Sequence, residues 1–434
     1  MVQDVIDRLI AGTHADPDGG PPLRVETRAV VIAKSLAGME ADIVRPLSLG
    51  RRLAVVSDPT IHAILGGRVE RALMSLGEVS SIVLPEHPHP DDATVERVRA
   101  ATGAADALVA VGSGTINDLC KYAGARDRKP YVVFGTAPSM NGYTSLNAAI
   151  TVHGHKKSLP AQAPVGAFLD LSILAAAPVR MIRSGLGDSL CRATAQADWL
   201  LAHLLFDLPY RTMPFVLLAE DEPELFASAE ALVNGDLDAM EKLVRTLLLS
   251  GFGTAICGNS LPASQGEHLI SHYGDMLPDG GRPFTFHGEQ IGVTTLTMAR
   301  LQGRMLDGPP PTVSADRNTE ADFIARFGST LGSSCWTDFS QKRLTAEKAA
   351  RVNQRIADKW PKIREAISAI FLRADMLALV LQAAKAARTP EDLGWPRASY
   401  RAAVRHAREI RNRYTFLDLA GDADMLDKMI PEIA

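Results

Sequence analysis

The sequence predicts two domains of different class, an α/β domain over residues 1–178 and an all-α domain over residues 179–434. Three observations predict this division. The chain has 434 residues, which exceeds the size at which a single core usually keeps growing. Its first part alternates short runs rich in Val and Ile with helix-like stretches. Its second part carries long segments with helical periodicity.

Four short apolar runs predict the strands of the α/β domain. Each run ends in turn-forming or small polar residues, as strands commonly do. Runs that are apolar throughout indicate strands buried on both faces, and therefore a parallel sheet with crossover helices. The runs cover residues 51–58, 80–85, 105–114 and 129–136. Helical spacing of apolar residues is seen between them, over residues 61–77 and 92–104.

The second part is predicted to be helical because its apolar residues recur with a period of 3.6 and few β-branched residues cluster. The clearest of these segments cover residues 188–205, 240–256 and 345–387. We therefore expect a Rossmann-like α/β domain followed by a helical domain, with the active site in the cleft between them. The N-terminal segment, which contains the turn-rich residues 13–22, is expected to be a flexible lead-in, and we assign it no function.

Composition and charge exclude several classes of protein. A net charge of −4 and a pI near 6.3 favour neither nucleic acid nor an anionic membrane as partner. No apolar run reaches the roughly 18–20 residues that span a bilayer, and the N-terminus lacks the layout of a signal peptide. The four cysteines are far apart, which predicts neither a zinc ribbon nor a disulfide framework. We expect a cytoplasmic protein.

A glycine turn lies between the third predicted strand and the helix that follows it. Gly112, Ser113 and Gly114 bring the backbone to the start of that helix, where unpaired N–H groups favour an anion such as a pyrophosphate. The pattern is not G-x-G-x-x-G, because position 117 is Asn. A purely structural turn remains the alternative. Asp118 either caps the helix or points into the phosphate site.

Two other strand ends offer hydrogen-bonding groups. Asp58 ends the first predicted strand, where a carboxylate either accepts hydrogen bonds from a ribose diol or caps the next helix. A ribose contact would favour a cofactor without a 2′-phosphate. The loop over residues 134–145 is dense in hydroxyls and small residues, which suits contacts to phosphate or nicotinamide but equally suits an exposed turn.

Three histidines within twenty residues suggest a metal site. His268 and His272 are spaced i, i+4 and lie on one face of a predicted helix, and His287 follows after a loop. Two histidines and one carboxylate would leave a coordination position open, as a catalytic metal requires. Chance placement on a polar helix remains the alternative, since the spacing alone is not diagnostic.

The carboxylate that best completes such a set is Asp188. It stands at the expected start of the first helix of the second domain. Two glycines nearby, Gly185 and Gly187, are expected to let the backbone turn sharply at this point.

Seven stretches, taken in order, make the chain resemble the sn-glycerol-1-phosphate dehydrogenase family. That family belongs to a wider group with the iron-containing alcohol dehydrogenases, glycerol dehydrogenases and dehydroquinate synthases. Each stretch is weak alone, and together they span about residues 50 to 420. The stretches are VAVGSGTINDLCKY (109–122), FGTAPSMNGYTSLNAAI (134–150), GHKKSLPAQAP (154–164), APVRMIRSGLGDSLCRATAQADW (177–199), LPASQGEHLISHY (261–273), FHGEQIGV (286–293) and REIRNRYTFLDLA (408–420).

The resemblance implies a dehydroquinate synthase-like fold with a metal and a nicotinamide cofactor. The metal, zinc or nickel with iron left open, would be held by Asp188, His268 and His287. His272 would face the substrate and bind a hydroxyl or relay a proton. The cofactor, NAD(H) with NADP(H) left open, would be bound by Asp58, Gly112, Ser113, Gly114, Thr115, Asp118, Thr136, Ser139 and Ser145.

The resemblance also implies an activity, the interconversion of sn-glycerol 1-phosphate and dihydroxyacetone phosphate in phospholipid metabolism. We expect the protein to be a homo-oligomer, namely a dimer. A phosphorylated substrate needs cationic or N–H donors. The candidates are His153, Lys156 and above all Lys157, although a solvated basic loop is the alternative.

One residue departs from the family pattern, because Asn141 stands where the family usually has a substrate-contacting Asp. Asn still donates and accepts hydrogen bonds but cannot act as a base. A catalytically impaired NAD-binding homologue is therefore one alternative. A cyclase or lyase of the dehydroquinate-synthase type is another, although such enzymes carry Glu where this chain has Asp188.

Overall fold

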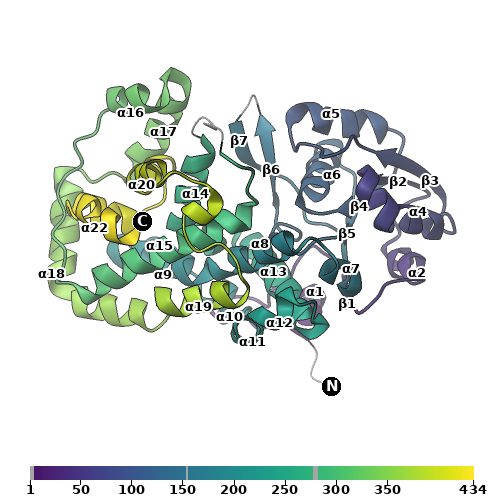
Figure 1. Cartoon of the computed structure of the whole chain (residues 1–434), viewed down its shortest axis with the longest axis horizontal. Helices are drawn as coiled ribbons and strands as arrows, with labels where there is room; N and C mark the ends of the chain where they lie inside the picture. Colours follow the sequence, from purple (N-terminus) through teal and green to yellow (C-terminus); the bar gives the residue numbers. More distant parts are fainter. Residues whose placement is uncertain (1–3, 153–154, 277–281) are drawn as a thin grey trace. The chain divides into compact units, whose positions relative to one another are not determined.

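The computed structural model of the chain describes residues 4–152, 155–276 and 282–434 (Figure 1). By their contacts the residues group into two compact units. The first comprises residues 1–189 and 212–260, and the second comprises residues 190–211 and 261–434. This grouping differs from the predicted boundary after residue 178. The division into a nucleotide-binding and a metal-binding domain stays a prediction.

A six-stranded parallel sheet forms the framework of the first unit, in the order β1-β8-β5-β4-β2-β3. The four predicted strands are confirmed, and two further strands extend the sheet at the β1 side. The central strands are buried, whereas β3 is an edge strand with exposed residues. The strands are β1 (Ala29–Ala33), β2 (Arg52–Ser57), β3 (Glu78–Val83), β4 (Ala107–Gly112), β5 (Tyr131–Gly135) and β8 (Gly166–Asp170).

Helices cover both faces of this sheet. On one face, apolar residues of α2 (Glu40–Val44) and α4 (Gly67–Leu73) join a core with alternate residues of β2 and β4. On the other, α6 (Gly114–Asp127) packs on β4, and α5 (Asp92–Ala101) packs on α6 (Figure 1). The α/β class predicted from the alternating runs is therefore confirmed.

The order of the strands reverses between β2 and β4. The chain leaves β2 for β3 at one edge, whereas β4, β5 and β8 continue in the opposite direction. Val56 is in register with Ala110, so two residues further along the parallel strands Asp58 reaches the level of Gly112. Parallel sheets bind ligands at such a switch point, outside the carboxyl ends of the strands.

A β-hairpin that the sequence did not reveal precedes β8. Its strands are β6 (Asn147–Val152) and β7 (His155–Pro160). After β8 the chain forms α7 (Leu171–Ala175) and then α8 (Val179–Leu190), whose last residue already belongs to the second unit.

The N-terminal segment is ordered, and the expectation of a flexible lead-in is wrong for residues 4–25. Helix α1 (Val5–Ala11) contributes Leu9 to a buried cluster that includes Phe252 of α13 (Leu237–Cys257). Asp4 forms an ion pair with Arg245 of α13 at 2.7 Å. The apolar spacing in α1 explains the difference, because it gives the segment a face to bury. Three short helices complete this unit, α10 (Met213–Val216), α11 (Asp221–Ala227) and α12 (Ala229–Val233).

Helices and loops make up the described part of the second unit, as the long periodic segments predicted. Its core gathers large buried side chains such as Phe323, Phe339 and Phe416. None of the described helices combines the length and apolar character that crossing a membrane would take. The helices are α9 (Arg192–Phe206), α14 (Gly266–Met276), α15 (His287–Asp307), α16 (Glu320–Phe327), α17 (Ser329–Lys342), α18 (Ala346–Ser368), α19 (Ala374–Ala383), α20 (Arg397–His406), α21 (Phe416–Asp422) and α22 (Leu426–Ile433).

Candidate active site

The glycine turn joins β4 to α6 at the switch point. A Cβ atom at Gly112 would lie 2.6 Å from the Cβ of Ile116, so a side chain there would push the helix off the strand. Ser113 is the N-cap residue of α6, and its side chain makes no capping hydrogen bond. Gly114 and Thr115 open the helix, and no acidic residue stands in its first turn. The N–H groups of this turn therefore suit an anionic ligand.

Thr136 lies beside this turn, just beyond the end of β5. Its backbone N–H donates to the carbonyl of Gly112 at 3.2 Å. Its hydroxyl is buried and has no hydrogen-bond partner among the described residues. An orphaned buried hydroxyl is costly, and a bound ligand would satisfy it. Together with the uncapped helix and the switch point, this hydroxyl shows that the residues present fit a dinucleotide.

Asp58 caps a helix in the structure. One of its carboxylate oxygens accepts a hydrogen bond from the N–H of Ile61 at 2.9 Å, at the start of α3 (Pro59–Ile61). The chain then forms a π-helical turn, η2 (His62–Gly66), an irregularity that is common at functional sites. The capping alternative thus describes what the side chain does here, and the ribose contact stays a prediction.

The other predicted nucleotide ligands make hydrogen bonds within the first unit. Asp118 accepts from the N–H of Ala149 in β6 at 3.0 Å. The Ser145 hydroxyl accepts from the Lys121 ammonium at 3.2 Å. Ser139 is buried, and its carbonyl accepts from the Ser184 hydroxyl at 3.0 Å. These three residues support the loop between β5 and β6, and their contact with a cofactor stays a prediction.

Asp188 lies in the last turn of α8, not at the start of a helix as expected. Its Oδ2 accepts a hydrogen bond from the backbone N–H of Asn141 at 2.9 Å, and the residue is 1% exposed. The sharp turn expected at Gly185 and Gly187 is also wrong, because both glycines lie inside α8. A Cβ atom at Gly185 would meet the carbonyl of Pro138, so the glycine lets the helix approach the loop that carries Asn141.

The three histidines lie close together at α14 and the start of α15. The ring centroid of His268 lies 5.7 Å from that of His272 and 5.1 Å from that of His287. The rings of His272 and His287 stack at 5.9 Å. The helical spacing predicted for the first pair is therefore confirmed, and the structure brings the third ring to them.

A buried carboxylate orients His268. Glu267 accepts a hydrogen bond from its Nδ1 at 2.9 Å, which leaves the lone pair of the neutral ring on Nε2. Glu267 is fully buried and also accepts from the N–H of Gln265 at 2.7 Å and from the Thr194 hydroxyl at 3.0 Å. Burial alone would raise the pKa of Glu267, but the hydrogen bond from His268 lowers this pKa below its ordinary value.

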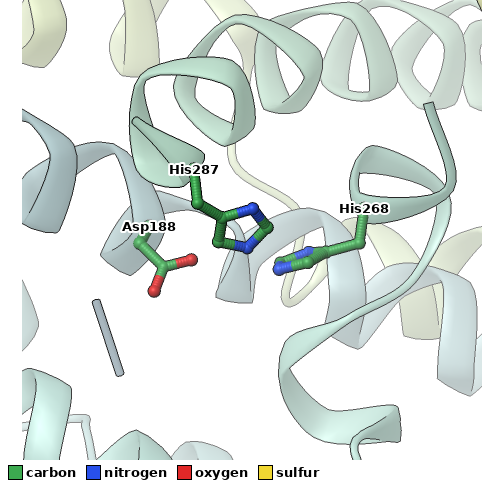
Figure 2. Close-up of side chains that lie close together, drawn as sticks. All are labelled: Asp188, His268 and His287. Carbon is green, nitrogen blue, oxygen red and sulfur yellow. The ribbon is translucent and has the colours of Figure 1, made fainter. Parts of the chain in front are cut away.

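One ligand atom from each of Asp188, His268 and His287 lies within 4.8 Å of the other two. Figure 2 shows the carboxylate and the two imidazoles pointing toward one another. Such a donor set, with two nitrogens and one oxygen, fits a divalent metal with an open position. Cys191, Glu267 and His268 form a second set at the same separation. Three donors already hold Glu267, so we assign it to the support of His268.

The remaining predicted residues concern the substrate. The side-chain amide of Asn141 donates to the Ser250 hydroxyl of α13 at 3.2 Å. Lys157 is exposed on β7, in agreement with a solvated basic loop. His153 and the side chain of Lys156 lie outside the described part of the chain.

Two buried charged residues near the site were not singled out from the sequence. Glu267 directly precedes the candidate metal ligand His268, so the adjacent Glu and His in the sequence could have indicated a carboxylate that supports the ligand. Lys121 is fully buried in α6, three residues before Gly124 and four after the buried Asn117. A lysine on the apolar face of a predicted helix was the signal there.

Solved structures similar to this chain share its fold. A probable glycerol dehydrogenase from Sinorhizobium meliloti gives a TM-score of 0.61 at 17% identity, covering 93% of this chain and 98% of that one. A 1,3-propanediol oxidoreductase gives a TM-score of 0.61 at 15% identity, covering 94% of this chain and 98% of that one. These likenesses show the expected dehydroquinate synthase-like fold.

Sequence comparisons show the family. Residues 31–178 match the family described as iron-containing alcohol dehydrogenase. A glycerol-1-phosphate dehydrogenase of Pyrococcus furiosus is 34% identical over 281 residues, which are 64% of this chain and 79% of that protein. The enzyme of the same name from Bacillus subtilis is 30% identical over 287 residues, which are 64% of this chain and 73% of that protein. The chain therefore belongs to the glycerol-1-phosphate dehydrogenase family, within the iron-containing alcohol dehydrogenases.

Proposed function

We propose that the protein is a metal-dependent, NAD(H)-linked dehydrogenase that interconverts sn-glycerol 1-phosphate and dihydroxyacetone phosphate. The observation that carries the proposal is the approach of Asp188, His268 and His287 to within 4.8 Å of one another. The names of the relatives from Pyrococcus furiosus and Bacillus subtilis support the substrate and the cofactor.

The metal would be held by Asp188, His268 and His287. When bound, it would polarise the substrate oxygen and lower the pKa of the alcohol. Two imidazoles and one carboxylate suit zinc or nickel, and we propose these ahead of iron. Glu267 keeps the proton of His268 on Nδ1 and thereby directs the Nε2 lone pair toward the shared space.

Residues of the chain would hold the substrate in the orientation that allows reaction and would disfavour other orientations. The His272 ring lies beside both candidate histidine ligands, so it would bind a substrate hydroxyl or relay its proton. Asn141 would hold the substrate through its side-chain amide, which has a second N–H and a carbonyl oxygen besides the N–H that donates to Ser250. Lys157 is the candidate for the substrate phosphate.

The nucleotide would bind at the switch point. Gly112, Ser113, Gly114 and Thr115 would hold the pyrophosphate at the N-terminus of α6. The orphaned hydroxyl of Thr136 would receive a hydrogen-bond partner. A carboxylate at position 58 favours an unphosphorylated ribose, so we propose NAD(H) ahead of NADP(H).

The test is the formation of reduced nicotinamide, followed by its absorbance, after mixing the protein with NAD+ and a panel of alcohols. We expect sn-glycerol 1-phosphate to react faster than its enantiomer sn-glycerol 3-phosphate and faster than unphosphorylated glycerol. Elemental analysis of the same preparation should find about one zinc or nickel per chain. Equal rates with all three alcohols would refute the substrate that we propose.

A second candidate function rests on Asn141, which stands where the family resemblance implies a substrate-contacting Asp. In that case the protein binds NAD(H) without turnover, and Asn141→Asp creates activity that the natural protein lacks. A cyclase of the dehydroquinate-synthase type is distinguished by the same assay, because it shows no net formation of reduced nicotinamide. Asp188 supports the dehydrogenase instead, because the resemblance implies a Glu at this position in the cyclases.

We also propose that the protein works in the cytoplasm as a homodimer, with a role in phospholipid metabolism. Light scattering coupled to size-exclusion chromatography tests the dimer directly. A mass of one chain over the working concentration range would refute it.

A further inference from the structure

A fully buried lysine joins the helix of the glycine turn to the loop between β5 and β6. Lys121 lies in α6, and its side chain is 0% exposed. Its ammonium donates to the carbonyl oxygens of Gly142 at 2.5 Å and Asn147 at 3.1 Å, and to the hydroxyl of Ser145 at 3.2 Å. An ammonium has three N–H donors, so these three acceptors satisfy it completely.

Burial of this charge is costly. Desolvation lowers the pKa of Lys121 to about 8, against the opposing effect of the Asp118 carboxylate, whose Oδ1 lies 3.8 Å from the Lys121 ammonium. An apolar side chain of similar length would fill the same space without that cost. We therefore infer that Lys121 offsets this cost by holding residues 142–147 in place through its hydrogen bonds.

That segment starts next to Asn141, which contacts the candidate metal ligand. The backbone N–H of Asn141 donates to Oδ2 of Asp188 at 2.9 Å, and its side-chain amide donates to Ser250 at 3.2 Å. The Thr144 hydroxyl donates to the carbonyl of Leu248 at 2.7 Å. The loop is thus held by α13 on one side and by Lys121 on the other, and Asn141 is the point where it meets Asp188.

We propose that Lys121 is a positioning residue that sets the orientation of Asp188 through the backbone of Gly142 and Asn141. The chain of contacts runs from α6 to the loop and from the loop to the carboxylate, and every contact is a hydrogen bond of the first unit. The inference rests on the proposed function to the extent that Asp188 is taken as a metal ligand. It assigns Lys121 a task separate from any direct contact with cofactor or substrate.

The experiment compares Lys121→Met with Lys129→Met in the full-length protein. Lys129 is a matched control, because its ammonium also donates to two carbonyl oxygens, those of Thr102 and Gly103 at 2.7 and 2.8 Å, and these acceptors follow α5, outside the loop between β5 and β6. Zinc affinity is measured by competition with a chromophoric chelator, and NAD+ affinity by calorimetry. Circular dichroism reports whether each variant is folded.

We expect Lys121→Met to weaken zinc binding about 10-fold or more, as is common when a supporting contact of a metal ligand is lost. NAD+ affinity should fall by a smaller factor than zinc affinity, because the glycine turn is untouched and Ser145 alone among the predicted cofactor ligands loses its hydrogen bond to the lysine. Lys129→Met should bind zinc like the natural protein. A folded Lys121→Met variant with zinc affinity within twofold of the natural protein would overturn the proposal.

Hydrogen exchange in the natural protein keeps the proposal testable if Lys121→Met does not fold. Residues 141–147 should exchange nearly as slowly as α6, and exchange as fast as that of an exposed loop would overturn it. Both readouts are independent of turnover. If zinc binding is normal in the natural protein but no polyol phosphate reacts, the proposed substrate fails while Lys121 keeps its task. If the natural protein binds no zinc at Asp188, both the proposed function and the positioning role of Lys121 are refuted.

Discussion

The candidate metal ligands Asp188 and His268 are held in different ways. Asp188 receives its hydrogen bond from the N–H of Asn141, which is 47 residues away in the sequence and lies on a loop. His268 receives its support from Glu267, its neighbour in the same helix. Both supports bury a charge, since Lys121 holds the loop behind Asp188 and Glu267 is itself a buried carboxylate.

The two ligands of this candidate site therefore depend on contacts of different range along the sequence. The His268 support is set by α14 together with Thr194 of α9. The Asp188 support requires α6, the loop and α8 to be correctly packed on one another. We expect the second arrangement to respond more strongly to substitutions far from the site.

The largest effect is expected from removing a ligand itself. His268→Ala should abolish metal retention and lower turnover on the order of 1000-fold or more, while NAD+ affinity is kept. Metal content and steady-state rates measure this. His272→Ala is the matched control on the same helix, and it should lose turnover but keep its metal. Loss of metal in His272→Ala would show that the ligand set is wrongly assigned.

The local support is tested by Glu267→Gln, which keeps the shape of the side chain but removes its charge. We expect metal affinity to fall about 10- to 100-fold, because the His268 ring loses the carboxylate that fixes its proton on Nδ1. Competition with a chelator measures the affinity. Glu320→Gln, at an exposed glutamate of α16, is the control and should leave metal affinity unchanged. Unchanged affinity in Glu267→Gln would remove Glu267 from the site.

The long-range support predicts a dependence of stability on pH. The pKa of Lys121 is about 8 in the folded protein, against an ordinary value near 10.5. Between these values the unfolded state binds more protons, so the free energy of unfolding should rise with pH. The rise from pH 8 to 10 should be larger than in Lys121→Met by about 2 kcal/mol. Denaturant titrations of both proteins at pH 8 and pH 10 measure this rise. An equal rise in the free energy of unfolding in the two proteins would contradict the lowered pKa of Lys121.

The smallest effect is expected at the cofactor side, where Asp58 both caps a helix and is the candidate ribose ligand. Asp58→Ala should weaken NAD+ binding about 10-fold and cost about 1 kcal/mol of stability. Asp91→Ala removes a comparable cap, whose carboxylate accepts from Thr94 at 2.8 Å, and should cost stability alone. Equal NAD+ affinity in the two variants would leave Asp58 with its capping task only.

Much of the fold could be predicted because the signals are local. The buried strands β2, β4 and β5 are continuous apolar runs, and α13 and α18 repeat with the helical period. The strand β1 was missed because its five residues are short and only partly buried. The turn expected at Gly185 was wrong because a glycine inside a helix can serve a close approach to another segment, here Pro138.

The residue types of the site can be identified from the amino-acid sequence alone, because histidines at helical spacing, an aspartate and a glycine turn are local patterns. Which of these residues meet, and which contacts hold them in place, depends on how distant segments pack. The supports of Asp188 and His268 are hydrogen bonds to buried partners. The donors Lys121, Asn141 and Thr194 meet their acceptors only after distant segments have packed. These hydrogen bonds contribute strongly because the groups are buried, and a buried polar group without a partner destabilises the protein by its full desolvation free energy.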